Sequence, residues 1–280
     1  MRIREIAKLA LPPIILMGMR KVRSLSRVQT IRPAFEGPVS SWAEAERQSD
    51  GWDAQVILDK TLDVSLKVKR GDIVFQQDTV VYDRIRYSDT ILAFLTLVAS
   101  ANDGAINIVD FGGSLGTNFF QNRHVLKTCM EGGNCAWSII ERKAIVNFGR
   151  KHFQNEILRF FETVDEARRV LRTLPRSVLF SGSLQCLENP YFILDQVIGA
   201  GVDLLAFDRL LCSPIQEHEI YIQNPDPHRY YAASYPVWCF SRTKFIEYLG
   251  ARSFELIAEL SQRPELTFNH AGMIFRRMRS

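Results

Sequence analysis

The chain has 280 residues, of which 46% are hydrophobic and 24% are charged, and its formal net charge is +4 at pH 7. This balance is typical of a soluble globular protein with a real core, organised as one α/β domain with additions or as two small domains. The basic residues are spread along the chain rather than clustered among aromatic ones, so the sequence does not favour nucleic-acid binding.

The cysteines and histidines show no metal-binding or disulfide pattern. The five cysteines form no CxxC pair, and the five histidines have no HExxH-like spacing. We therefore expect neither a metal site nor a disulfide framework, and we expect a reducing, cytoplasmic compartment.

An apolar run from Leu9 to Met19 stands near the start of the chain and contains two prolines. The run is too short to span a bilayer. We favour a short segment that docks on the body of the domain. The alternative is peripheral contact with the anionic inner face of a membrane. In that alternative the contacts come from the basic residues Arg20, Lys21 and Arg23.

Three helices are predicted in the first third of the chain, in the segments 40–48, 54–71 and 87–102. Serine residues stand at the start of the first and the third segment, where an N-cap is expected. We therefore expect residues 1–104 to form a mostly helical N-terminal extension, of which residues 1–39 are a peripheral segment.

From residue 105 onward, strand and helix patterns alternate. Apolar stretches typical of buried strands recur at 105–111, 136–141, 158–164, 177–183 and 202–208. Helical patterns separate them, and this alternation predicts a parallel sheet that is covered on both faces. Two further strands are predicted at 253–260 and 272–278. No crossover helix joins these two, so they should pair as antiparallel neighbours.

Five parallel strands followed by an antiparallel C-terminal hairpin make a seven-stranded, Rossmann-like α/β sheet. This is the topology of class I S-adenosylmethionine (SAM) methyltransferases. We expect residues 105–280 to form a SAM-binding methyltransferase domain. The segment at about 210–238 is rich in histidine, tyrosine and tryptophan, and we expect it to be a substrate insertion.

A glycine-rich turn follows the first strand of this domain, in the stretch IVDFGGSLG. In an open α/β sheet, ligands bind beyond the carboxyl ends of the strands, and glycine turns let backbone N–H groups approach them closely. An ordinary strand-to-helix turn is the alternative. The residues that we predict to bind the cofactor here are Asp110, Gly112, Gly113 and Gly116.

Glu141 ends the second strand, one helix and one strand after the glycine turn. A carboxylate has two acceptor oxygens and can bind both hydroxyls of a ribose, so the turn and the acid together predict an adenosine ligand. Asp110 would repel the pyrophosphate of a nicotinamide dinucleotide, but a carboxylate attracts the sulfonium and amino group of SAM. We therefore favour SAM, with an NAD(P)-dependent oxidoreductase as the alternative. Ser114 stands where the middle glycine of the DxGxGxG pattern is usual.

Four other candidate site residues follow the fourth and fifth strands. We predict that Ser183 and Gln185 contribute to the cofactor and methyl-transfer site, although capping of the next helix explains them nearly as well. Asp208 and Arg209 are candidate catalytic residues, as a general base and as an anchor for an anionic substrate. A buried structural pair is the alternative for these two.

Several stretches of the chain resemble a family of SAM-dependent methyltransferases associated with surface-polysaccharide biosynthesis in bacteria. They include SSWAEAE, IVDFGGSLGTNFFQNR, WSIIERKAIVNFGRKHFQN, LFSGSLQCLENPY and YYAASYPVWCFSRTKF, and the resemblance covers most of the chain from about residue 40 onward. The chain departs from the family's pattern at Cys186, where tyrosine is usual, and at Leu210-Leu211, where Thr-Pro is usual. The second departure falls at a strand end that faces the expected substrate pocket.

The resemblance implies an enzyme that methylates a small-molecule substrate, a sugar or a sugar nucleotide. A non-catalytic, methyltransferase-like scaffold at the membrane surface is a further alternative.

Overall fold

The computed structural model of the chain describes residues 33–262 and 269–278, and the described residues from Ala34 onward belong to one compact unit. The apolar run near the start of the chain, which we expected to dock on the domain or contact a membrane, lies outside the described residues. Within the described part of the chain, no helix is long and apolar enough to cross a membrane.

The three helices predicted before residue 104 are present. They are α3 (Trp42–Arg47), α4 (Gln55–Arg70) and α5 (Asp89–Ala101). The Ser41 hydroxyl accepts a hydrogen bond from a backbone N–H in the first turn of α3, and Ser88 does the same for α5. The serines at the helix starts therefore act as N-caps, as their positions predicted.

The described residues of this part of the chain also contain three short strands, which the sequence did not predict. β2 (Phe75–Gln77) and β3 (Val80–Tyr82) form an antiparallel hairpin. β1 (Phe35–Val39) pairs with a strand from the distant segment 210–238. Strands this short depend on their pairing partners more than on local propensity, and the sequence pattern therefore does not show them.

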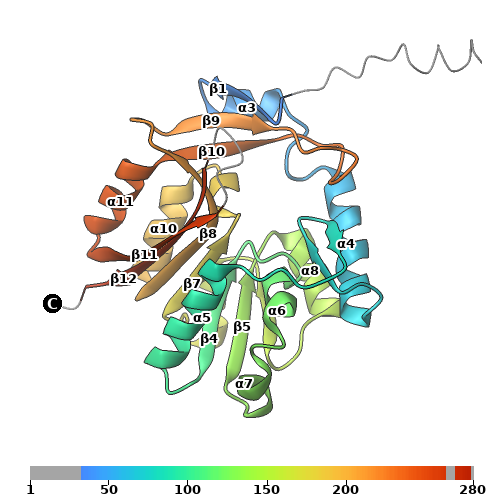
Figure 1. Ribbon diagram of the computed structural model, residues 1–280, viewed down its shortest axis with the longest axis vertical. Helices are drawn as coiled ribbons and strands as arrows, with labels where there is room; N and C mark the ends of the chain where they lie inside the picture. The colour runs from blue at the N-terminus through green and yellow to red at the C-terminus, as the bar shows by residue number, and fades with distance from the viewer. Residues whose placement is uncertain (1–32, 263–268, 279–280) are drawn as a thin grey trace, which may run out of the picture. The chain divides into compact units, whose positions relative to one another are not determined.

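Five parallel strands form the centre of the main sheet. Their order is β6 (Leu158–Phe161), β5 (Cys135–Ile140), β4 (Ile106–Phe111), β7 (Ser177–Ser181) and β8 (Leu204–Ser213). β12 (Asn269–Arg277) pairs antiparallel with β8, and β11 (Phe254–Gln262) pairs antiparallel with β12. The parallel centre and the closing hairpin are therefore confirmed. This is the strand order of a Rossmann-like α/β sheet, closed here by an antiparallel hairpin (Figure 1).

The described sheet has ten strands, not the seven that the sequence predicted. The additional strands are β1, β9 (Glu219–Gln223) and β10 (Tyr235–Ser241), and β10 joins the end of β8. The segment 210–238, which we expected to be a substrate insertion, therefore extends the sheet. β9 alternates between partly and fully buried residues, and its inner side packs on α3. A distant helix thus supplies the burial that stabilises these strands.

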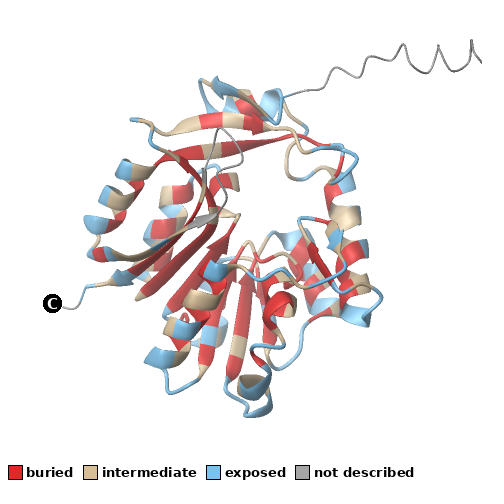
Figure 2. Cartoon of the chain, viewed as in Figure 1, coloured by how far each residue is buried: buried red, intermediate tan, exposed pale blue. Residues whose placement is uncertain are grey.

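Helices cover both faces of the parallel strands. Val109 and Phe111 of β4 point into one apolar cluster, and Ile106 and Ile108 point into another. The central strands are almost wholly buried, and the helices bury one side each (Figure 2). The remaining helices are α6 (Thr117–Asn122), α7 (Lys127–Glu131), α8 (Lys143–His152), α9 (Val164–Leu171), α10 (Pro190–Gly199), α11 (Arg242–Gly250) and the 3-10 turn η1 (Leu184–Cys186). Each fully buried Ile, Val or Phe contributes about 1.5–3 kcal/mol, so the two clusters hold the strand ends firmly in place.

Candidate functional site

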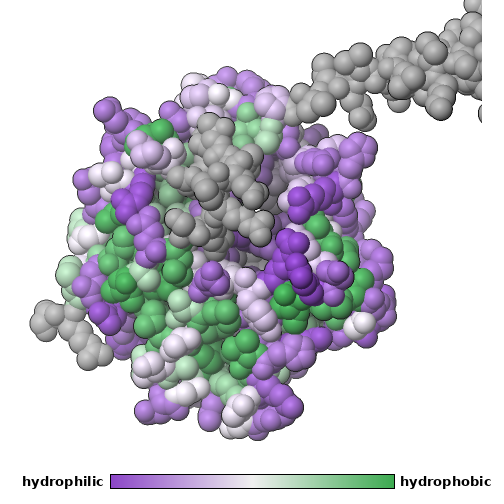
Figure 3. Space-filling model, in the orientation of Figure 1, coloured by the Kyte–Doolittle hydropathy of each residue, from purple (hydrophilic) through white to green (hydrophobic). Residues whose placement is uncertain are grey.

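A cavity of about 340 Å³ lies at the carboxyl ends of the parallel strands β4, β5, β6 and β7. The space-filling view shows a hollow near the centre of the face drawn, with hydrophilic side chains along its right side (Figure 3). The residues that line the cavity come from the segments 52–61, 76–79, 111–117, 140–145 and 181–187, together with Glu162 and Tyr231. The carboxyl edge of the sheet is where an open α/β fold binds its ligands.

The glycine turn after β4 forms part of the cavity wall through Gly112, whose φ is +71°. A Cβ atom on Gly112 would lie 2.4 Å from the Cβ of Ser183. Ser183 also lines the cavity, and its hydroxyl donates a hydrogen bond of 2.5 Å to the carbonyl oxygen of Phe111. The loop after β7 therefore packs so closely on the turn after β4 that only glycine fits at position 112.

Asp110 lies beneath this turn and is fully buried. Its carboxylate accepts hydrogen bonds from Asn118 Nδ2, at 3.2 Å, and from Trp137 Nε1, at 3.1 Å. A Cβ atom on Gly113 would lie 2.5 Å from the Asp110 carboxyl carbon. Neither Asp110 nor Gly113 lines the cavity, so the structure places both of them behind its wall.

Burial raises the pKa of Asp110 to about 7, although the hydrogen bonds from Asn118 and Trp137 act in the opposite direction. Nearby carboxylates at Glu141 and Asp208 raise this pKa further. The carboxyl group beneath the turn therefore titrates close to neutral pH.

Ser114 and Gly116 complete the turn. Ser114 lines the cavity with a φ of +53°, a left-handed conformation in which glycine is usual. Gly116 has a φ of +92°, forms the N-terminal boundary of α6 and does not line the cavity. Ser114 thus adopts the left-handed backbone conformation expected of a glycine at this place in the motif, and its backbone is locally strained.

Glu141 follows β5 directly and lines the cavity. Its side chain is 14% exposed, and it accepts a hydrogen bond of 2.7 Å from the backbone N–H of Arg142. Burial raises the pKa of Glu141, while the charge and backbone N–H of Arg142 and the backbone N–H of Ser114 lower it. The structure therefore brings the acid after β5 and the turn after β4 together at one cavity wall.

Gln185 and Asp208 lie outside the cavity lining. The Gln185 amide donates to the backbone oxygen of Arg209, at 3.1 Å. Asp208 is 1% exposed and accepts hydrogen bonds from the hydroxyls of Ser88, at 2.7 Å, and Ser181, at 2.6 Å. Its carboxylate is thus buried among hydrogen-bond donors and does not reach the cavity.

Arg209 lies next to Asp208, and its guanidinium forms ion pairs with two carboxylates. It forms an ion pair with Asp78, in the turn between β2 and β3, and its Nε lies 3.5 Å from Asp208 Oδ2. Burial alone would lower the pKa of Arg209, but the two carboxylates outweigh it and raise that pKa. The charge of Arg209 is therefore compensated within the protein.

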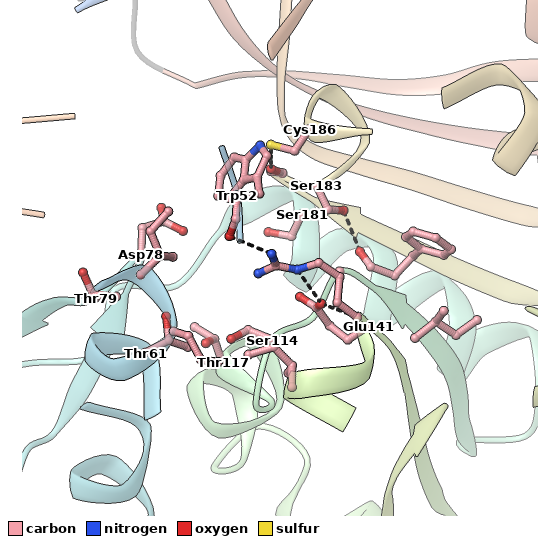
Figure 4. Close-up of a pocket in the computed structure, with 18 of the residues that line it drawn as sticks. Trp52, Thr61, Asp78, Thr79, Ser114, Thr117, Glu141, Ser181, Ser183 and Cys186 are labelled. Atoms are coloured by element: carbon pink, nitrogen blue, oxygen red, sulfur yellow. Dashed lines mark hydrogen bonds and ion pairs between the residues drawn. The ribbon is translucent and has the colours of Figure 1, made fainter. Parts of the chain in front are cut away.

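Sequence reasoning missed the residues that the N-terminal extension contributes to the cavity. Asp78 and Thr79 line it from the hairpin turn, and Trp52 and Thr61 line it from the segment around the start of α4. Figure 4 shows Trp52 beside Cys186 on one side of the cavity, with Asp78 and Thr79 on another. The stretch QDTV between two short apolar runs was a weak hairpin signal. No local signal marked Trp52.

Strained backbone gathers around this cavity. Of the non-glycine residues with positive φ, Asp78 (+51°), Thr79 (+68°) and Ser114 (+53°) line the cavity, and Arg209 (+54°) is bonded to Asp78. Such conformations cost on the order of 1–3 kcal/mol each and gather at functional sites. Among the described residues, no group of three or more His, Cys, Asp and Glu side chains is arranged to hold a metal ion.

No protein-family model and no curated protein matches the chain. Among solved structures, it is similar to the 1,6-didemethyltoxoflavin-N1-methyltransferase of Burkholderia thailandensis with bound 1,6-didemethyltoxoflavin and S-adenosylhomocysteine (SAH). That match has 15% identity and a TM-score of 0.46, and covers 87% of this chain and 93% of the other.

Two further structures show a comparable similarity. The N-terminal domain of EvdMO1 in the presence of SAH and D-fucose has 13% identity and a TM-score of 0.47, with 78% of this chain and 96% of the other covered. The magnesium protoporphyrin IX methyltransferase of Synechocystis PCC 6803 with bound SAM has 11% identity and a TM-score of 0.41, with 68% and 78% covered. At these identities the similarity concerns the fold alone.

Proposed function

We propose that the chain is a SAM-dependent methyltransferase of the cytoplasm, with residues 105–280 as its methyltransferase domain. The observation that carries the proposal is the position of Glu141. Its carboxylate lines the cavity at the end of β5, beside the Gly112–Ser114 turn at the end of β4. A carboxylate in this place can accept hydrogen bonds from both ribose hydroxyls of an adenosine ligand.

The residues of the turn fit such a ligand in different ways. Gly112 and Ser114 lie in the cavity wall, where their backbone can approach the cofactor. We assign Asp110 and Gly113 a positioning role, because the buried carboxylate supports the turn from behind. Gly116 allows the chain to enter α6 in the left-handed conformation. Ser183 joins the ends of β4 and β7 at the cavity wall.

We further propose a hydroxyl-bearing acceptor, a sugar or a sugar nucleotide of surface-polysaccharide biosynthesis. Hydroxyl and carboxylate side chains line the cavity together with aromatic rings, and such side chains suit a polyhydroxylated molecule. They include Thr61, Asp78, Thr79, Trp52 and Tyr231. The resemblance to the polysaccharide-associated family supports the same substrate class.

In this proposal, Asp208 and Arg209 do not contact the acceptor themselves but hold Asp78 in position. Asp208 receives two hydroxyl hydrogen bonds and holds Arg209 at 3.5 Å, and Arg209 in turn holds the Asp78 carboxylate. Gln185 holds the Arg209 backbone. The acceptor thus meets Asp78, while the buried pair behind it fixes the position of that carboxylate.

Bound SAM supplies an activated methyl group on a sulfonium, so the protein's task is to bind, orient and exclude water. Glu141 and the glycine turn bind the adenosine side, and the side chains from residues 52–79 cover the site opposite the sheet.

Titration with SAM, SAH, NAD⁺ and NADH under identical conditions tests the proposal. We expect binding of SAM and SAH and none of the dinucleotides. Binding of NAD(H) without SAM would identify an oxidoreductase instead. Binding of SAM without transfer to any sugar or sugar nucleotide of a panel would leave a SAM-binding scaffold.

A further inference from the structure

The segment Asp50–Ala54, which we call the strap, connects α3 to α4 and is fixed to β10 at one end. The Asp50 carboxylate accepts hydrogen bonds of 2.8 Å from both the backbone N–H and the hydroxyl of Ser234, and the N–H of Gly51 donates to the Ser234 carbonyl oxygen at 3.0 Å. The Trp52 ring stacks on Tyr235, with centroids 3.6 Å apart. Ser234 and Tyr235 are buried, so this attachment is shielded from water.

The other attachment of the strap is Arg142, at the start of α8. The Arg142 guanidinium donates 2.6 Å and 2.5 Å hydrogen bonds to the Trp52 carbonyl oxygen and the Asp53 carboxylate. A dashed line in Figure 4 ends at the Trp52 carbonyl oxygen and marks this hydrogen bond. The side chains of Arg142 and Asp53 are 41% and 94% exposed. Exposed ion pairs contribute little to stability, so this attachment opens far more easily than the one on β10.

Arg142 also touches Glu141. Its backbone N–H donates to the Glu141 carboxylate at 2.7 Å, and its side chain turns to the strap. One residue therefore contacts both the proposed ribose-binding acid and the strap. Trp52 lines the same cavity as Glu141, so the strap crosses the site from β10 to the end of β5.

We infer that the strap closes over the cofactor, that Trp52 contacts the bound molecule and that Arg142 is the positioning residue that fastens the closed strap. The inference rests on the proposed function, because it assigns the closure to a SAM or SAH molecule held at Glu141. The strap opens at its exposed Arg142 end and stays attached to β10 at its buried end. Gly51, with a φ of +80° and open space around its Cβ position, lies at the attached end.

The experiment measures SAH dissociation by rapid dilution or displacement, together with amide hydrogen exchange of the strap. Arg142→Ala removes both hydrogen bonds to the strap, and we expect SAH to dissociate about tenfold faster. Asp53→Ala removes only the hydrogen bond to the Asp53 carboxylate, which is exposed. We expect SAH to dissociate from this variant about threefold faster. Arg142→Lys keeps the positive charge, so SAH should dissociate from it more slowly than from Arg142→Ala.

Asp63→Ala is the matched control. Asp63 forms an exposed ion pair with Lys67 on α4, outside the cavity lining, so its loss should leave SAH dissociation unchanged. We also expect SAH to slow exchange in the 50–54 segment of the wild type about tenfold, and to slow it much less in Arg142→Ala.

The inference is overturned if SAH leaves Arg142→Ala and Asp53→Ala at the wild-type rate, or if SAH does not change exchange of the strap. Either result leaves the proposed function standing, because SAH still binds. If the wild type binds neither SAM nor SAH, the proposed function fails and the inference fails with it.

Discussion

The guanidinium of Arg209 forms an ion pair with the carboxylate of Asp78, 131 residues earlier in the chain. Arg209 directly follows the residues of β8 that pair with β7. Asp78 lies in the turn of the β2–β3 hairpin. The pair therefore ties the N-terminal extension to the carboxyl edge of the sheet, where the cavity lies.

We expect Arg209→Met to lower the free energy of unfolding by about 2–3 kcal/mol, because it leaves the buried Asp208 carboxylate without its neighbouring cation. Urea denaturation measures the loss. Arg168→Met is the control, because Arg168 is exposed and its ion pair with Asp165 lies on the surface of α9. An equal, small loss in both variants would contradict a structural role for Arg209.

Gly112→Ala should destabilise the protein by about 3 kcal/mol and abolish SAM binding. The φ of +71° and the 2.4 Å approach to the Cβ of Ser183 each exclude a side chain there. The double variant Gly112→Ala with Ser183→Gly removes the clash and should recover part of the stability. Gly250→Ala, where a Cβ atom meets nothing within 4 Å, should be almost neutral. A tolerated Gly112→Ala would show that the turn is looser than described.

Asp110 should make stability depend on pH. Its folded pKa of about 7 lies above the ordinary value of 3.8, so the folded state binds its proton more tightly than the unfolded state does. The contribution to stability therefore falls as the pH rises from about 4 to about 7. The difference in unfolding free energy between the wild type and Asp110→Asn, measured at pH 5 and pH 8, isolates this group. From pH 5 to pH 8, we expect the unfolding free energy of Asp110→Asn to rise relative to that of the wild type by a few kcal/mol. No change in that difference with pH would refute the shift.

Thr79→Gly should raise the free energy of unfolding by about 1 kcal/mol. A β-branched residue with a φ of +68° is strained, and glycine adopts this conformation freely. The Thr79 hydroxyl oxygen is buried and has no hydrogen-bond partner among the described residues, so its removal costs no bond there. Thermal and urea denaturation measure the gain. If Thr79 contacts the acceptor, the same variant should also raise the KM for the acceptor. A clear loss of stability would contradict the strain argument.

The sequence predicted the parallel strands and the closing hairpin because those elements follow from local periodicity. The apolar stretch of β4, the glycine turn and the acid after β5 lie within about one strand–helix–strand unit, so their proximity follows from the predicted topology. Local patterns also predicted the serine caps of α3 and α5.

The wall that faces the sheet could not be predicted in this way. Trp52 reaches the cavity because its ring stacks on Tyr235 and its carbonyl accepts a hydrogen bond from Arg142. Asp78 reaches it because of the ion pair with Arg209. These contacts join segments separated by about 90 to 180 residues, and no local pattern in either segment contains them. β9 and β10 pack on α3, which is also distant in the chain. Their place in the sheet depends on this contact, and no local pattern predicts it.

The affinity of SAM for the wild type and for Glu141→Gln, measured by calorimetry at pH 7.5, tests the central claim most directly. Glu131→Gln is the matched control, because Glu131 is exposed and lies outside the cavity lining. We expect SAM to bind the wild type and Glu131→Gln equally, and Glu141→Gln roughly 10- to 100-fold more weakly, as a lost hydrogen bond to a charged group predicts. Equal SAM affinity in all three proteins, or no SAM binding by the wild type, would contradict the account.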